Sequence, residues 1–398
     1  MKINRISNLI GISFLISGLY GQTVMTYNYK GGKNYTLVER TDLRRYENGK
    51  YKGLTSREVR SFISPSTYYT DDNSYYDLYE GNFYVDEDTV RASRNVSQSV
   101  HDAIPSVFKI DLNGNFSMLE DHGYPSFRSF PSYPSSSVKP GDVWEAYGER
   151  SVDPLNKGVF TKMPIYVQYT YLRDEQYNGE PVYLLSAAWA TRYGGTSGIF
   201  DIEGDKELLS AAGKHNATIY VSKATGKAVV VRDSVDETFV YGDGNKVGFK
   251  GTISLFTEYP PTVNAEEIKS KINEIENLEV EDTAAGLRLR LVDLQFLPDS
   301  PELVPGEEVR IDKIATALKQ VPESKFLIEG HTARTGTTDD EYELSVARAR
   351  KIAEMLSRRG IDAGQFICKG SGGNKPIADN GTREGRARNR RVEITILE

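Results

Sequence analysis

Residues 287–296 read Leu-Arg-Leu-Arg-Leu-Val-Asp-Leu-Gln-Phe, and apolar and charged side chains alternate over the first five positions. This period of two predicts a strand with one buried face. Downstream, apolar residues recur at helical spacing within 305–320 and within 344–359, where Gly360 ends the run. Three short apolar stretches predict further strands, at 325–330, 365–367 and 391–396. The order predicts a β-α-β-α-β-β sandwich over residues 285–398, with two helices on one mixed sheet.

The chain before this domain carries strand and turn signals. Residues 22–135 are rich in Tyr, Ser, Asp and Asn, and their short apolar runs are broken by Gly, Pro and Asn. Residues 136–260 contain β-branched and aromatic runs joined by turns such as Asn178-Gly179, which is typical of hairpins. We therefore expect a β-rich N-terminal region that forms an antiparallel sandwich or a curled sheet. The recurrence of Ser and Pro in 125–140 predicts an exposed loop or a boundary between the two stretches.

A connecting segment is expected over residues 261–284. Asn264 and the acidic residues after it predict the start of a short amphipathic helix, because Asn is a good N-cap and acidic side chains favour the first turn. This helix is expected to run to about Leu278. The acidic tract 279–282 then predicts a linker, so the whole chain is expected to be a multidomain α+β protein.

The N-terminus predicts export. Residues 1–21 have the layout of a secretory signal peptide, with Lys2 and Arg5 before the apolar run 9–16 and small residues after it. A single membrane anchor is the alternative, but interspersed polar residues make the stretch marginal for spanning a bilayer. No cysteine lies near the expected cleavage site for lipid attachment. The single cysteine, Cys368, excludes an internal disulfide and is expected to be a core residue.

Charge and composition narrow the classes of partner. The formal net charge is −7 and the isoelectric point is near 5.5, which argues against a protein that must neutralise many phosphates. We expect no nucleic acid, no cofactor and no metal site. The residues form no Ser-His-Asp, Cys-His or metal-ligand pattern along the chain, so we do not expect an enzyme.

The C-terminal domain carries a series of spaced motifs. In chain order they are Gly330-His331-Thr332 with Gly336, Leu344-Ser345-x-x-Arg348-Ala349, Gly360-Ile361, Gly370-x-Gly372, Pro376-Ile377-Ala378-Asp379-Asn380, and Thr382-x-x-Gly385-Arg386-x-x-Asn389-Arg390-Arg391-Val392. Their order and spacing resemble the OmpA-like C-terminal domain, the peptidoglycan-associating domain family, over about residues 285–398. The resemblance implies noncovalent binding of the diaminopimelate, or an equivalent diamino acid, in the stem peptides of peptidoglycan.

Such a ligand offers a free ammonium and a carboxylate, and a pocket must present an anion and a cation at matching separation. The resemblance implies that the cation is Arg348 and that the anion is the residue after Gly-His-Thr. Here that residue is Ala333, and truncating one side of a buried charge pair costs about 2–5 kcal/mol. Four nearby carboxylates could replace it, namely Asp299, Asp339, Asp340 and Glu341. The expected ligand set is Arg348, Asp299, Thr332, Glu341 and Arg390.

Simpler interpretations of these residues stay open. Arg348 could be a helix-surface arginine paired with Glu341 or Glu343. His331 has no second ligand at metal-binding spacing and is expected to be a hydrogen-bonding structural residue. The resemblance implies that Asn389 fixes a loop.

Two functions are therefore weighed. The first is a cell-envelope protein, periplasmic and associated with the outer membrane of a Gram-negative-type bacterium, whose domain tethers the N-terminal β module to peptidoglycan or to a wall-linked protein. An envelope protein would then be the partner of the N-terminal region. The alternative is a degenerate OmpA-like domain that no longer binds peptidoglycan and serves as a structural or protein-interaction module.

Overall fold

The structure is a computed structural model. It describes residues 21–27, 33–69, 75–90, 95–96, 100–194, 204–261, 263–272, 275 and 277–398. The predicted signal peptide, residues 1–21, lies outside the described residues except for Gly21. Among the described residues, no helix combines the length and the apolar content that crossing a membrane requires.

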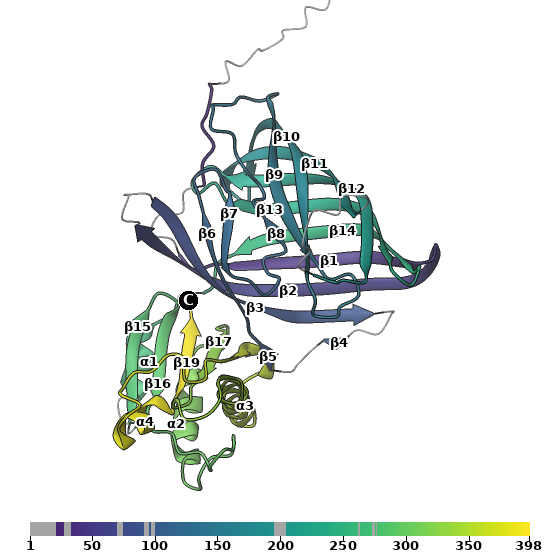
Figure 1. The fold of residues 1–398 in the computed structure, drawn as a ribbon. Helices are drawn as coiled ribbons and strands as arrows, with labels where there is room; N and C mark the ends of the chain where they lie inside the picture. Colours follow the sequence, from purple (N-terminus) through teal and green to yellow (C-terminus); the bar gives the residue numbers. More distant parts are fainter. Residues whose placement is uncertain are drawn as a thin grey trace, which may run out of the picture.

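The N-terminal region forms one curled antiparallel sheet (Figure 1). Its strands lie in the order β7-β6-β3-β2-β1-β14-β13-β12-β11-β10-β9-β8, and β4 pairs with β3 off this path. Their bounds are β1 Thr36–Glu47, β2 Lys50–Tyr69, β3 Tyr75–Val90, β4 Asn95–Val96, β6 Ile104–Ile110, β7 Phe116–Glu120, β8 Phe127–Arg128, β9 Val143–Val152, β10 Thr161–Tyr177, β11 Glu180–Gly194, β12 Leu208–Ser222, β13 Ala228–Tyr241 and β14 Lys246–Glu258. The predicted curled sheet and its hairpin at Asn178-Gly179 are confirmed.

Long-range pairing joins the two sequence stretches of this region. Strand β1 pairs with β14 along its whole length, from Thr36 opposite Glu258 to Glu47 opposite Val247. Residues on either side of position 135 therefore share one sheet, which carries a larger apolar cluster and a smaller one around Tyr79 and Phe108. The larger cluster lies on the concave side and is built largely from the alternate, inward-facing residues of β9 to β14.

The expectation of an exposed loop over 125–140 is wrong for its first half. Most residues from 123 to 133 are buried, including Phe127, Phe130 and Tyr133. The Phe130 ring lies 5.2 Å from Trp189 and 6.0 Å from Tyr169, measured between ring centroids. The segment crosses the concave side of the sheet and packs its aromatic side chains there. Burial of these aromatic side chains stabilises the segment inside the fold, although its Ser and Pro residues are typical of exposed turns.

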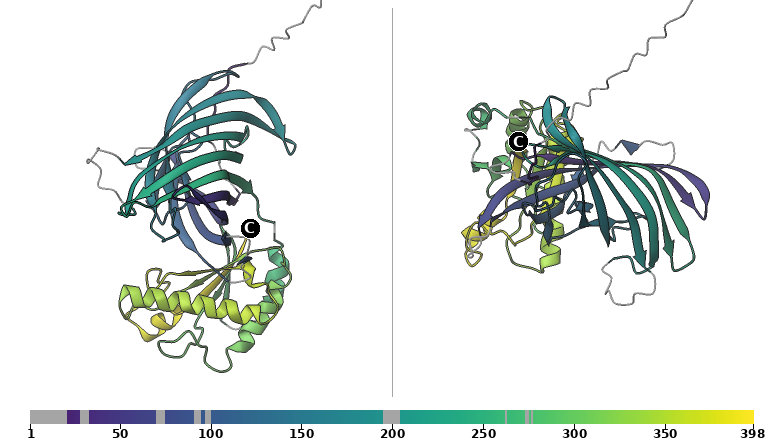
Figure 2. Two further views of the ribbon diagram at one scale, coloured as in Figure 1. Left: turned by 90° about the vertical axis from the view of Figure 1, so that its right-hand side faces the viewer. Right: turned by 90° about the horizontal axis from the view of Figure 1, so that it is seen from above.

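The C-terminal domain is a six-stranded mixed sheet covered on one face by helices (Figure 2). Its strand order is β15-β16-β19-β17-β18-β5. The bounds are α1 Ala265–Ile272, β15 Leu278–Thr283, β16 Gly286–Leu291, α2 Glu308–Leu318, β17 Phe326–Gly330, α3 Thr338–Ser357, the 3₁₀ turn Ala363–Gln365, β18 Phe366–Gly370, α4 Arg383–Asn389, β19 Val392–Leu397 and, from the N-terminal region, β5 His101–Asp102. The predicted β-α-β-α-β-β order holds within this larger arrangement.

Three local expectations need correction. The acidic tract 279–282 is not a linker but the middle of β15, which pairs with β16 as a hairpin. Its Glu279 and Glu281 form ion pairs with Arg290, so the partner strand neutralises the charge that made the tract resemble a linker. Helix α3 begins at Thr338, six residues before the apolar pattern, because Thr337 caps it by accepting a hydrogen bond from the Asp340 amide. Helix α1 is capped by Asn264 as expected but ends at Ile272.

The two sheets are joined by more than the connecting segment. Strand β5 belongs to the N-terminal part of the sequence but pairs in parallel with β18 of the C-terminal sheet. Next to it, the Ala103 amide donates a hydrogen bond of 2.8 Å to the Cys368 carbonyl. The face of the C-terminal sheet opposite its helices packs against the outer face of β2 and β3. The residues of this apolar contact are Phe62, Tyr84, Leu327, Ile367 and Leu397. The C-terminal sheet is therefore docked against the N-terminal one (Figures 1 and 2).

Candidate functional site

The site begins where β17 and β18 end against helix α3. A Cβ added to Gly330 would lie 2.1 Å from the Ser345 carbonyl oxygen, and one added to Gly370 would lie 2.5 Å from the Ser345 hydroxyl. Only glycine allows the helix to approach this closely. Glu341, Ser345 and Arg348 follow at positions i, i+4 and i+7 of α3, and all three are buried. The glycines of the motifs therefore set the position of Arg348.

Arg348 is a buried cation with few partners. The residue is 5% exposed, its Nε donates a hydrogen bond of 3.2 Å to the Ser300 carbonyl, and its guanidinium carbon lies 4.5 Å from the centre of the Phe296 ring. Among the described residues, no carboxylate oxygen lies within 4.0 Å of it, so the pairing with Glu341 or Glu343 is not formed. Burial, followed by the nearby charge of Arg390, lowers the pKa of Arg348 to about 10.

Of the four carboxylates considered as a replacement for the missing Asp, Asp299 alone acts on the charge of Arg348. Its exposed side chain opposes the lowering of the Arg348 pKa. Glu341 is buried and accepts hydrogen bonds from the amides of Thr335 and Gly336, at 2.6 and 2.7 Å. Asp340 accepts a hydrogen bond from the Thr337 hydroxyl at the start of α3. Glu341 therefore holds the loop after Ala333 and does not face Arg348.

The loop that carries Thr332 and Ala333 is fixed by backbone contacts. The Thr332 amide donates to the Gly372 carbonyl at 2.9 Å, while its buried hydroxyl has no hydrogen-bond partner among the described residues. Ala333 is 4% exposed. Asn389 accepts hydrogen bonds from the amides of Ile377 and Ala378, which confirms that it fixes a loop.

Residues 295–390 match the model of the OmpA family. This part of the chain is an OmpA family domain. The Peptidoglycan-binding protein ArfA of Mycobacterium tuberculosis (strain ATCC 25618 / H37Rv) is 37% identical over 103 residues, which cover 26% of this chain and 32% of that protein. The Probable lipoprotein YiaD of Escherichia coli (strain K12) is 38% identical over 104 residues, covering 26% and 48%. The match thus spans between about a quarter and just over a half of the length of such curated relatives.

Solved structures are similar to about a third of the chain. The cell wall anchor of the T6SS from Pseudomonas aeruginosa is 32% identical, with a TM-score of 0.29, over 33% of this chain and 94% of that one. The periplasmic domain of Helicobacter pylori MotB (residues 90–256) is 26% identical, with a TM-score of 0.29, over 32% and 83%.

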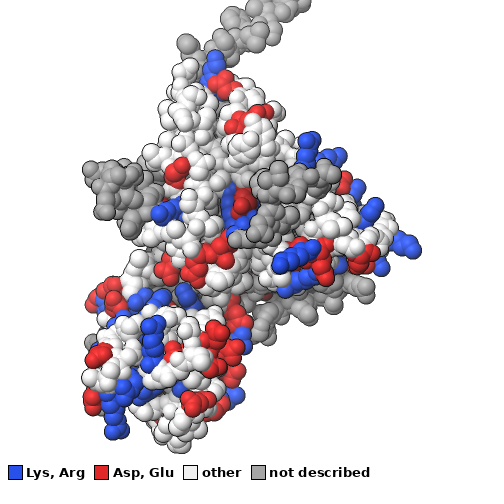
Figure 3. Space-filling model, in the orientation of Figure 1, with Lys and Arg blue, Asp and Glu red and all other residues white. Residues whose placement is uncertain are grey.

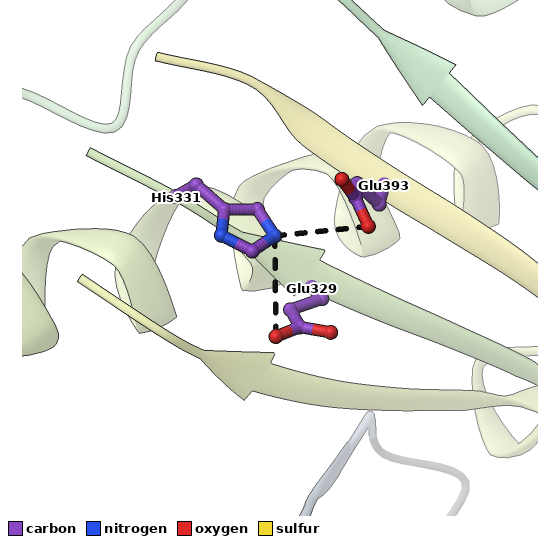
Figure 4. Close-up of side chains that lie close together, drawn as sticks. All are labelled: Glu329, His331 and Glu393. Carbon is purple, nitrogen blue, oxygen red and sulfur yellow. Dashed lines mark ion pairs between the residues drawn. The ribbon is translucent and has the colours of Figure 1, made fainter. Parts of the chain in front are cut away.

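The OmpA domain also contains a buried His with two carboxylates (Figure 4). Nε2 of His331 lies 3.9 Å from both Glu329 and Glu393, and neither ring nitrogen has a hydrogen-bond partner among the described residues. The expectation of a hydrogen-bonded His331 is therefore wrong. Burial lowers its pKa to about 4. The ligand atoms of these three residues lie within 4.8 Å of one another. However, Lys375 pairs with Glu329 at 3.1 Å and Arg391 pairs with Glu393 at 2.7 Å. A metal ion would have to compete with these two side-chain cations for the carboxylates.

The charged surface of the OmpA domain is divided. On the face in Figure 3, basic side chains gather over the side of β15, β16 and α4, and acidic ones gather toward α3. The half-buried Arg390, at the end of α4, belongs to the basic side and acts electrostatically on Arg348. A ligand carboxylate would meet an excess of positive charge there.

The sequence gives no hint of a second polar cluster, in the N-terminal sheet. Nδ1 of His215 lies 2.6 Å from Asp233, and its Nε2 lies 3.1 Å from the Thr191 hydroxyl. These are the distances of a catalytic triad, yet the three residues are only 1–2% exposed. Nε2 also lies 3.1 Å from Arg150, which pairs with Glu237 at 2.8 Å. The side chains of this cluster form a buried hydrogen-bonded network that connects β9, β11, β12 and β13.

Proposed function

We propose that the OmpA domain associates noncovalently with peptidoglycan by binding the diamino acid of a stem peptide, and that it fixes the N-terminal sheet to the wall. The observation that carries this is Arg348, a buried guanidinium without a carboxylate within 4.0 Å among the described residues. An unpaired buried cation is costly, so a ligand carboxylate gains both charge compensation and hydrogen bonds. A relative matched by this domain is named a peptidoglycan-binding protein.

The ammonium of the ligand needs a different partner from the missing Asp. Asp299 is the acidic neighbour whose charge acts on Arg348, and it is exposed and free to reorient. With the carboxylate on Arg348 of α3, the ammonium would be matched by Asp299 from the loop before α2 and not by a residue of the loop after β17. The Thr332 hydroxyl could form a further hydrogen bond with the ligand, and the charge of Arg390 adds to that of Arg348 where the ligand carboxylate binds.

Because the two sheets are docked together, we infer that the OmpA domain and the N-terminal sheet form one rigid unit. Because β5 pairs with β18 and an apolar contact joins the sheets, the wall-bound domain would carry the N-terminal sheet at a fixed orientation. The matched relatives include an outer-membrane lipoprotein, YfiB of Pseudomonas aeruginosa, which supports a place in the envelope, in the periplasm at the outer membrane. An envelope protein or a wall-linked protein would then meet the N-terminal sheet.

Co-sedimentation of the full chain with purified sacculi tests the proposal. Wild-type protein should pellet with the sacculi, and Arg348→Ala should reduce the retained fraction at least tenfold. Arg358→Ala removes an exposed arginine next to the same helix and is the matched control, expected to behave as wild type. Equal retention of the Arg348 and wild-type proteins would rule out this pocket.

The presence of Ala at position 333 favours one alternative function, in which the domain no longer binds peptidoglycan and serves as a structural module. The substitution removes the family anion from a buried position. Ala333→Asp decides between the two. If wild type fails to pellet and the variant pellets, the module is the correct function. If wild type pellets and the variant gains at most a few-fold, the tether stands.

A further inference from the structure

The concave side of the N-terminal sheet contains a cavity of about 180 Å³. Alternate residues of β1 and β2 form one wall, and the loop after β9, residues 153–156, forms another. Three of the lining side chains each contain a buried polar atom without a hydrogen-bond partner among the described residues. These atoms are Nε of Arg45, the hydroxyl of Thr55 and Nε of Arg57. Buried donors in folded proteins are almost always paired, so three orphans on one wall point to a ligand that accepts hydrogen bonds.

The charged side chains that line the cavity are three arginines, Arg45, Arg57 and Arg150, and three carboxylates, Glu39, Asp153 and Glu237. Arg150 is compensated by Glu237 at 2.8 Å and Arg45 by Glu47 at 3.1 Å. Arg57 has no carboxylate within 4.0 Å in the described part of the chain. Glu39 interacts electrostatically with Arg57, but its carboxylate accepts a hydrogen bond from the Ser126 hydroxyl, and burial raises the Glu39 pKa. Arg57 is therefore the arginine of this lining without an ion pair in the described part of the chain.

The rest of the lining is mixed, with Thr41, Ser126, Ser151 and Asn156 among its polar residues. Its apolar part includes Leu43 and Val59 from β1 and β2, and Leu155, Phe239, Phe249 and Ile253. A ligand that is acidic at one end and hydrophobic at the other would match both the unpaired donors and the apolar part of this lining. An engineered apolar cavity of ~150 Å³ holds benzene, so the space suits a body of about six to eight carbon atoms.

We propose that this cavity binds a small organic monocarboxylate, with its carboxylate at Arg57 and Thr55 and its apolar body against Phe239, Phe249 and Ile253. A carboxylate accepts hydrogen bonds from both groups and supplies the charge that Arg57 lacks. The site lies on the N-terminal sheet, so it is independent of peptidoglycan binding by the OmpA domain.

Calorimetric titration of the full chain with benzoate and octanoate tests this directly. At least one of the two should bind saturably. Acetate, which lacks the body, and benzyl alcohol, which lacks the charge, should each bind at least tenfold more weakly. Absence of saturable binding of both benzoate and octanoate at millimolar concentration would overturn the proposal, and so would equal affinity for the alcohol.

Two variants locate the site. Arg57→Gln should weaken binding at least tenfold, and Arg44→Gln, at an exposed position on the neighbouring strand, should bind as wild type. Thr55→Val keeps the side-chain shape and should weaken binding a few-fold even if Arg57→Gln fails to fold. Wild-type affinity in both Arg57→Gln and Thr55→Val would place the ligand elsewhere and contradict the assignment.

Discussion

Among single residues, Asp299 and Arg348 carry the proposed recognition of the stem peptide. Asp299 is exposed and forms no ion pair within 4.0 Å in the described structure, so Asp299→Asn should change the free energy of unfolding by less than about 0.5 kcal/mol. The same change should weaken sacculus binding about tenfold, because the ligand ammonium loses its partner. Asp339→Asn, an exposed acid in the first turn of α3, is the matched control. Equal weakening by both variants, measured by co-sedimentation, would indicate a general charge effect.

His331 makes stability depend on pH in a defined window. Burial lowers its pKa from the ordinary 6.5 to about 4, so the folded chain holds the neutral ring where the unfolded chain takes up a proton. The neutral His331 therefore contributes up to about 3 kcal/mol to the free energy of unfolding above pH 6.5, and this contribution is lost as the pH falls toward 4. Urea unfolding of wild type and of His331→Asn at pH 7 and pH 4.5 measures it. The loss should be smaller in the variant, and an equal loss would refute the shift.

Packing of α3 on β17 places the site, and Gly330 controls that packing. A Cβ on Gly330 would meet the Ser345 carbonyl at 2.1 Å, whereas one on Gly336 has nothing closer than 3.9 Å. Gly330→Ala should therefore destabilise the OmpA domain by about 1–3 kcal/mol, the usual cost of overpacking, and displace Arg348. Gly336→Ala should cost less than half as much. Thermal unfolding followed by near-ultraviolet circular dichroism compares them, and similar midpoints would contradict this account of the motif glycine.

Local pattern predicted the elements whose signal is local. Strand β16 shows its alternation in its own residues, and β17, α2 and α3 follow from apolar spacing. The sequence did not predict strand β15, because the acidic residues Glu279 and Glu281 are typical of a solvent-exposed linker. Only the structure shows that Arg290 on the partner strand pairs with both of them. The burial of Phe130 depends in the same way on Trp189, far along the chain. At the site, the motif located Arg348 but could not show that Glu341 turns toward the loop amides.

For the whole molecule, the docking of the two sheets determines whether the tether is rigid. Phe62, 4% exposed, belongs to the apolar contact with Leu327 and Ile367. Phe62→Ala should remove about 3–5 kcal/mol of packing, part of it from docking. The amide of Ala103, which donates to the Cys368 carbonyl, should then exchange its hydrogen faster. Leu112→Ala, at an exposed position, should leave this exchange unchanged. Slow exchange of Ala103 in the Phe62 variant would show that docking does not depend on this contact.

The most direct measurement is a calorimetric titration of the full chain with a diaminopimelate-containing stem tripeptide, beside Arg348→Ala and Arg358→Ala. The account predicts saturable binding of one tripeptide per chain by wild type and by the Arg358 variant, and at least tenfold weaker binding by the Arg348 variant. No measurable binding by wild type at millimolar tripeptide, or equal binding by all three proteins, would contradict it.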